Sequence, residues 1–231
     1  IGRAIAFQLL EAGWCVAAFD LPNTRLTRHY RSWARSATVI EGDAADEMTI
    51  RDTVRTTLDK FGRLDAVVCN AGIMIRRPIR RLTLNDWRRV IDTNLTSAFL
   101  VGREAGKRMI PRKRGKVVNI GSLMSEAARA TVGPYTAAKG GIKMLTRTMV
   151  AEWAQHGIQA NAIGPGYMLT DMNKPLVANE TFSSWVVGRV PQKRWGNPDE
   201  LVGAAVFLSS AASDYVNGQI IYVDGGMLAV L

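Results

Sequence analysis

Apolar and polar residues alternate along this chain in blocks of two kinds. Short, almost wholly apolar runs predict buried strands, at residues 14–19, 39–40, 64–69, 116–120, 159–163 and 219–223. Longer stretches with apolar residues at helical spacing predict helices, at residues 2–12, 46–61, 83–109 and 134–156 and from residue 197 onward. Apolar strands separated by helices are typical of a parallel sheet covered on both faces. We therefore expect an α/β fold: a doubly wound, Rossmann-like parallel sheet whose ligands bind beyond the carboxyl ends of the strands.

Residues at the ends of the predicted helices support these boundaries. Gly13 and Gly62 directly follow two helical stretches, as glycine commonly does just past a helix. Asp46, Thr83 and Asn197 stand where a side chain can cap the first turn of a helix. The local signals and the apolar pattern therefore agree.

Length and composition limit the class of protein. The chain has 231 residues, 47% of them hydrophobic, which is enough for one well-filled core. We expect a single domain over residues 1–231, with a substrate loop at about 167–196, where the pattern is irregular. Cys15 and Cys69 lie in apolar runs, which predicts buried, reduced thiols and a cytoplasmic protein. No apolar run approaches the ~20 residues of a membrane helix, and His29 and His156 lack the clustered partners of a metal site.

The formal charge of +10 allows two interpretations. Arginines cluster at residues 76–81, 88–89 and 112–114, which could attract an anionic substrate, a cofactor or a nucleic acid. Such residues also form ordinary solvated surface. Because no recognition helix or RNA-binding aromatic motif accompanies the charge, we expect no nucleic-acid partner.

Tyr135 and Lys139 form the most informative pair of residues. Positions i and i+4 share a helix face, so the phenol and the ammonium can meet over one site. A nearby cation favours the phenolate and should lower the pKa of Tyr135 toward the range useful for acid–base work. Ser122, just past a predicted strand end, and Asn94, on a predicted helix, could join them.

The ends of the predicted strands carry acidic residues and glycines. An acidic side chain at the position of Asp20 can accept hydrogen bonds from an adenosine ribose and repel a 2′-phosphate, although it could also be a plain helix cap. Asp43 ends the following strand and could reach an adenine. Small residues at 70–72 and 164–166 would let the backbone approach a ligand closely, although each could be simple turn chemistry. Together these residues predict a cofactor crevice.

In order and spacing these motifs resemble those of the short-chain dehydrogenase/reductase family. The resemblance covers the whole chain and is carried by Asn70-Ala71-Gly72, Asn94, Ser122, Tyr135 with Lys139, and Pro165-Gly166. It implies that Tyr135 is the general acid/base and that Ser122 binds the reacting oxygen. It also implies that Lys139 lowers the Tyr135 pKa and holds the nicotinamide ribose, that Asn94 positions a relay water, and that Thr170 contacts the cofactor.

Within that family the closest likeness is to the gluconate 5-dehydrogenases, or 5-ketogluconate reductases. It is carried by residues 119–126, 164–167, 194–196 and 204–210. Arg76 and Arg77 follow the 70–72 turn, and a guanidinium fork suits a carboxylate. We expect Arg76 to bind the substrate carboxylate and Glu126 to bind substrate hydroxyls, although solvated surface charge is an equally simple explanation of each.

The family's glycine-rich turn is nearly absent from this sequence. Residues 1–6 match only the end of that turn, with Gly2, and the helix behind it, where amides would hold a pyrophosphate. The preceding strand would lie between those ending at Asp20 and Cys69. We expect roughly twenty residues before Ile1 in the native protein, which intact-mass measurement would test.

Several alternatives remain open at this point. The leading hypothesis is an NAD-linked oxidoreductase acting on a sugar acid or its keto form, with NADP possible. Enzymatic alternatives are a 2-deoxygluconate 3-dehydrogenase-like protein and a 3-oxoacyl carrier-protein reductase, and a non-catalytic basic binding protein is an alternative of another class. The resemblance also implies a homotetramer formed through the helices near 83–109 and 134–156. The apolar tail at 227–231 could pack on a neighbour or simply be a frayed end.

Overall fold

Parallel strands form the middle layer of the protein in a computed structural model that describes residues 1–22 and 24–230. The strands are β1 (Val16–Asp20), β2 (Ala37–Glu41), β3 (Ala66–Cys69), β4 (Gly115–Ile120), β5 (Ile158–Pro165) and β6 (Ile220–Val223). Each pairs in parallel with its neighbour, in the order β3-β4-β5-β6 and, separately, β1-β2. The predicted parallel sheet is confirmed.

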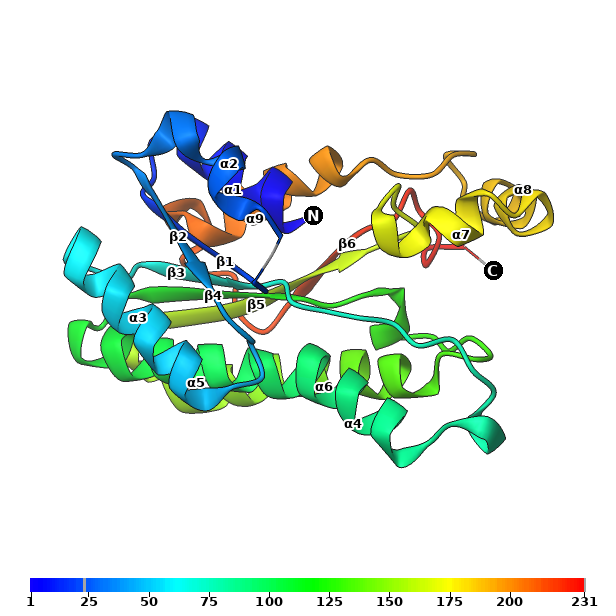
Figure 1. Cartoon of the computed structure of the whole chain (residues 1–231), viewed down its shortest axis with the longest axis horizontal. Coiled ribbons are helices and arrows are strands. Elements are labelled where there is room, and N and C mark those ends of the chain that lie inside the picture. The colour runs from blue at the N-terminus through cyan, green and yellow to red at the C-terminus, as the bar shows by residue number, and fades with distance from the viewer. Residues whose placement is uncertain (23, 231) are drawn as a thin grey trace.

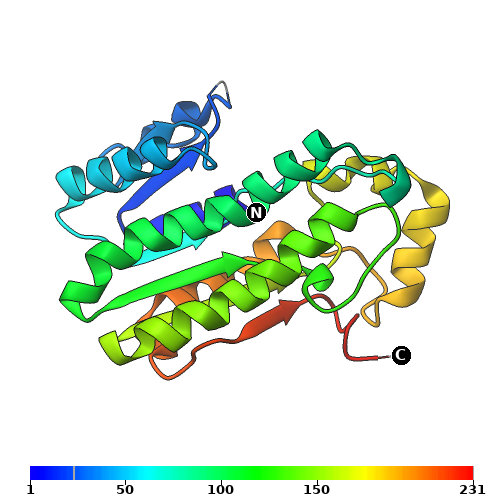
Figure 2. The ribbon, with the colours of Figure 1, turned by 90° about the horizontal axis from the view of Figure 1, so that it is seen from below.

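Helices cover both faces of this sheet, as the apolar pattern predicts. They are α1 (Gly2–Glu11), α2 (Leu26–His29), α3 (Glu47–Phe61), α4 (Leu84–Ile91), α5 (Ser97–Met109), α6 (Gly133–Trp153), α7 (Lys174–Val177), α8 (Glu180–Arg189) and α9 (Val202–Ser209). Figure 1 shows α1, α2 and α9 on one face and α3 to α6 on the other. In Figure 2 the long helices α5 and α6 run along the strands, and α7 and α8 lie at the far end of the sheet.

The sheet is interrupted between β1 and β3. No ladder joins these two strands in the part of the chain that the structure describes, so β1-β2 and β3-β4-β5-β6 are separate ladders. Helix α1 covers the interruption, because Ile5 and Leu9 belong to a core cluster that also takes in Val16 of β1 and Val68 of β3.

The predicted helix ends are confirmed at several positions. The Asp46 side chain accepts a hydrogen bond from the Thr49 amide at 2.7 Å, and Gly62 ends α3 with a φ of 74°. Thr83 and Asn197 each begin a helical segment with a capping box. The predicted helix over 83–109 differs in one respect, because a π-helical turn at Asp92–Thr96 separates α4 from α5.

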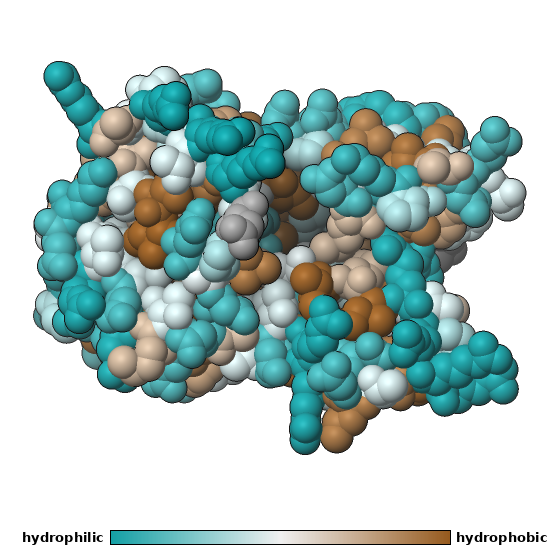
Figure 3. Space-filling view, viewed as in Figure 1, coloured by the Kyte–Doolittle hydropathy of each residue, from teal (hydrophilic) through white to brown (hydrophobic). Residues whose placement is uncertain are grey.

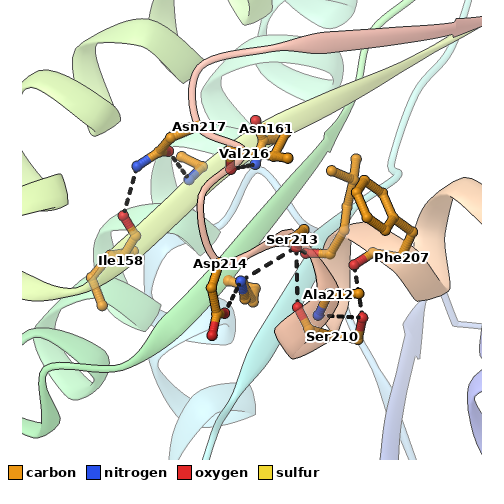
Figure 4. Close-up of polar contacts among 12 residues, drawn as sticks. Ile158, Asn161, Phe207, Ser210, Ala212, Ser213, Asp214, Val216 and Asn217 are labelled. Carbon is orange, nitrogen blue, oxygen red and sulfur yellow. Dashed lines mark hydrogen bonds and ion pairs between the residues drawn. The ribbon is translucent and has the colours of Figure 1, made fainter.

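A polar network holds the connection between α9 and β6 at the amino-terminal end of the strands (Figure 4). The Asn161 amide donates to the Val216 carbonyl at 2.7 Å, and Asn217 bonds both Ala160 and Ile158 of β5. Since buried polar groups are costly without partners, these bonds stabilise the register of β5 and β6. They lie at the end of the sheet opposite to the predicted site.

The expectation of buried thiols needs correction for Cys15, which is exposed because it precedes the first paired residue of β1. Cys69 is partly buried, and burial raises the pKa of its thiol to about 12. Both are free thiols, as predicted. In the apolar tail, Met227 packs in a core cluster of this chain rather than being frayed, whereas Leu231 lies outside the described residues. Among the described residues no helix is long and apolar enough to span a membrane.

Candidate active site

Ser122 stands just beyond the carboxyl end of β4. Every residue of β4 is buried, which fixes the strand in the centre of the sheet. Ser122 has an extended backbone, and its hydroxyl accepts a hydrogen bond from the Met124 amide at 3.1 Å. The side chain of Ser125 in turn bonds the Lys139 carbonyl, so the turn is tied to α6. The serine hydroxyl is therefore rigidly placed at the sheet edge.

Tyr135 lies in the first turn of α6, where Pro134 favours the start of a helix. Its hydroxyl is hydrogen-bonded to that of Ser122, and Arg76 is close enough to act on it electrostatically. Burial nevertheless raises the pKa of Tyr135 above its ordinary value, with Ser122 and Arg76 opposing the rise. The expected lowering of the Tyr135 pKa is therefore wrong for the protein without bound cofactor, because the effect of burial is larger than that of Ser122 and Arg76 together.

Lys139 is buried one helical turn further along α6, with 3% of its surface exposed. Its ammonium lies 5.5 Å from the centroid of the Tyr135 ring and donates to the Ile120 carbonyl at 2.6 Å. Burial lowers the pKa of Lys139 to about 8. The two side chains share a helix face as predicted, although the ammonium is directed to the end of β4.

Asn94 faces the same site from the π-helical turn between α4 and α5. Its amide nitrogen donates to the carbonyls of Ile73 and Val90 at 2.9 and 2.8 Å. Its carbonyl oxygen is buried and has no hydrogen-bond partner in the protein. A Cβ at Gly72 would lie 2.8 Å from that oxygen, so only glycine leaves the oxygen open. A buried unpaired acceptor is the feature expected of a residue that binds a water molecule.

The predicted cofactor residues gather along one edge of the sheet. Asp20 is the last residue of β1 and Asp43 follows β2, which pairs directly with β1, and both are exposed. Asp20 and Asp43 also accept hydrogen bonds from the amides of Leu21 and Ala45, so each shapes its own turn. Their carboxylates nevertheless remain open to solvent, where a ribose or an adenine could reach them.

The remaining cofactor candidates come from three other turns. Asn70, Ala71 and Gly72 follow β3, and Gly2 begins α1. A Cβ on Gly2 would lie 2.7 Å from the side-chain nitrogen of Asn70, so the start of α1 lies beside the turn that follows β3. Pro165 ends β5, but a Cβ on Gly166 would meet Asp224 Cα at 2.6 Å. Gly166 is thus required for packing against the chain itself, a reason that the sequence does not reveal.

The two residues predicted to contact substrate have different environments. Arg76 donates to the Met172 carbonyl at 3.2 Å and interacts electrostatically with Tyr135. Its neighbour Arg77 is paired with Asp86 at 2.6 Å, which supports the choice of Arg76. The Glu126 carboxylate accepts hydrogen bonds from Lys143 at 2.6 Å and from Tyr222 at 2.8 Å, so fewer of its acceptor sites are open to substrate hydroxyls. Its expected role stays a prediction.

Sequence reasoning missed Arg129 and the aromatic residues around it. Tyr167 follows the Pro-Gly turn and packs edge to face against Phe182, Trp185 and Trp195. The Arg129 guanidinium lies 5.1 Å from the centroid of the Phe182 ring. The aromatic residues at 182 and 185 have helical spacing and could have been noticed, whereas no sequence signal marks Arg129.

A cavity of 480 Å³ borders the Pro-Gly turn, and Gly166, Tyr167, Arg194, Glu200 and Tyr222 are among its lining residues. Figure 3 shows that this face of the molecule is hollowed between the side of α1 and α2 and the side of α7 and α8. The hollow has hydrophobic side chains in its walls and hydrophilic ones at its rim. Ser122, Tyr135 and Lys139 are not among the residues that line the cavity, so the cavity does not itself contain the catalytic candidates.

This protein has a parallel sheet with helices on both faces and a Ser–Tyr–Lys cluster at the carboxyl ends of the strands. These two features together define a class of dinucleotide-fold oxidoreductases. A family model for enoyl-(acyl carrier protein) reductase, which represents short-chain dehydrogenases/reductases, matches residues 1–228. The chain belongs to the short-chain dehydrogenase/reductase family.

Individual relatives show which members of that family this chain resembles. Gluconate 5-dehydrogenase of Gluconobacter oxydans (strain 621H) is 46% identical over 189 residues, which cover 82% of this chain and 74% of the relative. A crystal structure of a proposed gluconate dehydrogenase from Agrobacterium tumefaciens matches with a TM-score of 0.95 and 59% identity, covering 99% of this chain and 92% of that one. Gluconate 5-dehydrogenase of Burkholderia cenocepacia J2315, crystallised with NADP and tartrate, matches with a TM-score of 0.94 and 41% identity, covering 99% and 91% of the two chains.

Proposed function

We propose that this protein is an NAD(P)-dependent oxidoreductase that interconverts a sugar acid and its keto form, of the gluconate and 5-ketogluconate type. The observation that carries the proposal is the hydrogen-bonded hydroxyl pair of Ser122 and Tyr135 with the Arg76 guanidinium beside it. The hydroxyls suit proton transfer at a reacting oxygen, and the guanidinium suits a carboxylate. The names of the relatives and the tartrate bound in one of them, a dicarboxylate, support the same substrate class.

The residues of the site divide the chemical work. A nicotinamide cofactor supplies or accepts the hydride when it is bound. Tyr135 gives a proton to the substrate oxygen or takes one from it, and Ser122 stabilises the charge that develops there. Lys139 places a cation beside the phenol, and the unpaired Asn94 oxygen holds a water that can relay a proton from solvent.

The raised pKa of Tyr135 gives the two directions of reaction different pH dependences. At neutral pH the phenol is protonated and can protonate a carbonyl oxygen, so reduction needs no prior ionisation. Oxidation of the alcohol needs the phenolate. The rate of oxidation should therefore rise with pH through the alkaline range, while the rate of reduction should not.

The turns at the sheet edge suit the cofactor itself. The first amides of α1, beginning at Gly2, are free to bind a pyrophosphate, and Asn70, Ala71 and Gly72 leave room beside the unpaired Asn94 oxygen. Thr170, Pro165 and Gly166 would border the nicotinamide, and Asp20 and Asp43 the adenosine. Asp20 favours NAD, since its carboxylate repels a 2′-phosphate. Use of NADP is a second possibility, because the relative from Burkholderia cenocepacia was crystallised with NADP.

A substrate panel tests the proposal. Gluconate, 5-ketogluconate, 2-deoxygluconate and an acetoacetyl thioester would each be assayed with NAD and with NADP. We expect turnover of the first two, with a higher kcat/KM for one of the dinucleotides.

Reduction of a 3-oxoacyl carrier protein is the second candidate, because the matching family model concerns carrier-protein reductases and the surface is basic. Activity on the thioester alone would favour that candidate and overturn the first.

A homotetramer is the proposed assembly. Helices α4, α5 and α6 expose Trp87, Phe99 and Met144 by 41%, 43% and 56%, which supports an interface along these helices. Light scattering coupled to gel filtration would measure the mass, and a monomer at enzyme-assay concentration would contradict the assembly. A cytoplasmic location stays a prediction from the two free cysteines.

A further inference from the structure

Arg129 lies in the segment between Ser122 and α6 and is half-buried against segment 167–196. Its guanidinium lies over the Phe182 ring of α8, 5.1 Å from the ring centroid, and it donates a hydrogen bond to the Tyr167 hydroxyl. A guanidinium has five N–H donors, and the bond to Tyr167 uses only part of them. The side chain is therefore oriented while part of its hydrogen-bonding capacity remains free.

Arg76 approaches the same place from the segment after β3. Its hydrogen bonds go to two uncharged acceptors, the Met172 carbonyl and the Asn173 side chain, at 3.2 and 3.4 Å. Burial and the charge of Arg129 both lower the pKa of Arg76, so the two cations are near one another. Arg76 also interacts electrostatically with Tyr135 and with Tyr167, the tyrosine that Arg129 contacts, so Tyr167 lies between Arg129 and the arginine nearest the proton-transferring hydroxyl.

Neither arginine has an anionic partner within the described residues 1–22 and 24–230. Other arginines near the site do have one, since Arg77 pairs with Asp86 and Arg194 pairs with Glu200. Two neighbouring cations without a counter-charge repel each other, and an anion placed between them relieves that repulsion. A carboxylate has the planar geometry that a guanidinium fork binds with two parallel hydrogen bonds.

We propose that Arg129 is a second specificity-determining residue, which binds the substrate carboxylate together with Arg76 while Phe182 and Tyr167 hold it in place. The inference rests on the proposed function and adds to it a second residue that binds the carboxylate of the substrate. Because Tyr167 and Phe182 both belong to segment 167–196, the packing of that segment controls how well the acid is bound. The aromatic residues around Tyr167 thereby acquire a role in substrate choice.

The test compares a sugar acid with its uncharged amide, in the protein and in Arg129→Gln. We expect the KM for the acid to rise by about 10- to 100-fold in the variant, as for the loss of hydrogen bonds between charged groups. The KM for the amide should hardly change, and kcat should change little for either compound. Arg129→Lys keeps the charge without the planar fork and should recover only part of the loss. Phe182→Leu, which removes the cation–π contact, should raise the KM for the acid alone by a smaller factor.

Arg80→Gln is the matched control. Arg80 carries the same charge and is exposed, and it makes no side-chain hydrogen bond or ion pair with the described residues. Its variant should leave the KM for the acid unchanged, so that a loss confined to Arg129→Gln cannot come from the general surface charge. Equal losses for acid and amide in Arg129→Gln would overturn the inference while the proposed function stands.

Calorimetric titration with tartrate, with and without NADP, separates the inference from the proposed function. If the protein binds tartrate in a way that Arg129→Gln weakens at least tenfold, the inference stands even when no sugar acid turns over. If sugar acids turn over but neither their KM nor tartrate binding depends on Arg129, the inference fails. Absence of both turnover and tartrate binding would overturn both.

Discussion

Lys139→Met should make the protein more stable while removing its activity. Lys139 is 3% exposed. Within the described residues its ammonium donates one hydrogen bond, to the Ile120 carbonyl at 2.6 Å. Burial lowers the pKa of Lys139 from 10.5 to about 8. Since methionine has a similar length and no charge, the substitution removes the buried cation without leaving a large cavity.

The magnitude follows from this pKa. A fall from 10.5 to about 8 corresponds to a penalty of ~3 kcal/mol for the ammonium in the folded protein. The penalty is present in full below the folded pKa. As pH rises from about 8 to 10.5 the folded state loses its proton before the unfolded state does, so the free energy of unfolding increases until the penalty is gone. After subtracting ~1 kcal/mol for the lost hydrogen bond, Lys139→Met should gain ~2 kcal/mol at neutral pH.

Urea unfolding at neutral pH, at pH ~9 and at pH ~10.5 would measure both effects. Lys60→Met is the control, because Lys60 also donates to a backbone carbonyl, that of Ala37 at 2.7 Å, but is exposed. It should gain no stability at neutral pH. A Lys139→Met variant that is less stable at neutral pH, or that keeps the alkaline increase of the parent protein, would refute the reasoning. A gain in stability with loss of activity is the trade-off expected at a functional site.

Three further substitutions test other parts of the site. Tyr135→Phe removes the hydroxyl bonded to Ser122, so kcat should fall by about 10²- to 10⁴-fold while dinucleotide affinity, measured by fluorescence titration, stays nearly unchanged. Gly72→Ala places a Cβ 2.8 Å from the Asn94 oxygen, so kcat should fall and the free energy of unfolding should drop by ~1–3 kcal/mol. Glu126→Gln should leave the KM for the sugar acid unchanged in steady-state assays, because Lys143 and Tyr222 engage that carboxylate. In the same variant the pKa of Tyr222, which burial and then Glu126 raise, should fall in a spectroscopic titration.

Each of these has an outcome that would contradict it. Full activity of Tyr135→Phe would remove Tyr135 from proton transfer. A Gly72→Ala variant with unchanged kcat would show that the Asn94 oxygen is not used during turnover. A large rise in KM for Glu126→Gln would return Glu126 to the substrate site. Gly140→Ala is the control for Gly72→Ala, because a Cβ at Gly140 meets nothing within 4 Å.

Much of the fold was predictable from the sequence because its signals are local. The alternation of apolar strands with helices, and the caps at Asp46, Thr83 and Asn197, each depend on a few neighbouring residues. The convergence of Ser122 and Tyr135 was also predictable, because Ser122 follows β4 and Tyr135 begins the next long helix, which starts at the same carboxyl end of the sheet.

Other features depend on contacts that no local pattern encodes. The direction of the Tyr135 pKa shift is decided by burial between packed elements, and Glu126 is engaged by Lys143 and by Tyr222, a residue 96 positions away. The π-helical turn that aims Asn94 lies inside a stretch with an ordinary helical pattern. Arg129 was missed for the same reason, since its position near Phe182 exists only in the folded chain.

The most direct test of the proposed function is the absorbance of reduced nicotinamide during incubation of the protein with 5-ketogluconate. We predict steady oxidation of the reduced cofactor by the protein, and oxidation at least about 100-fold slower by Tyr135→Phe at equal concentration and with comparable cofactor binding. Turnover of an acetoacetyl thioester with none of 5-ketogluconate or gluconate, or equal turnover by both proteins, would contradict the account.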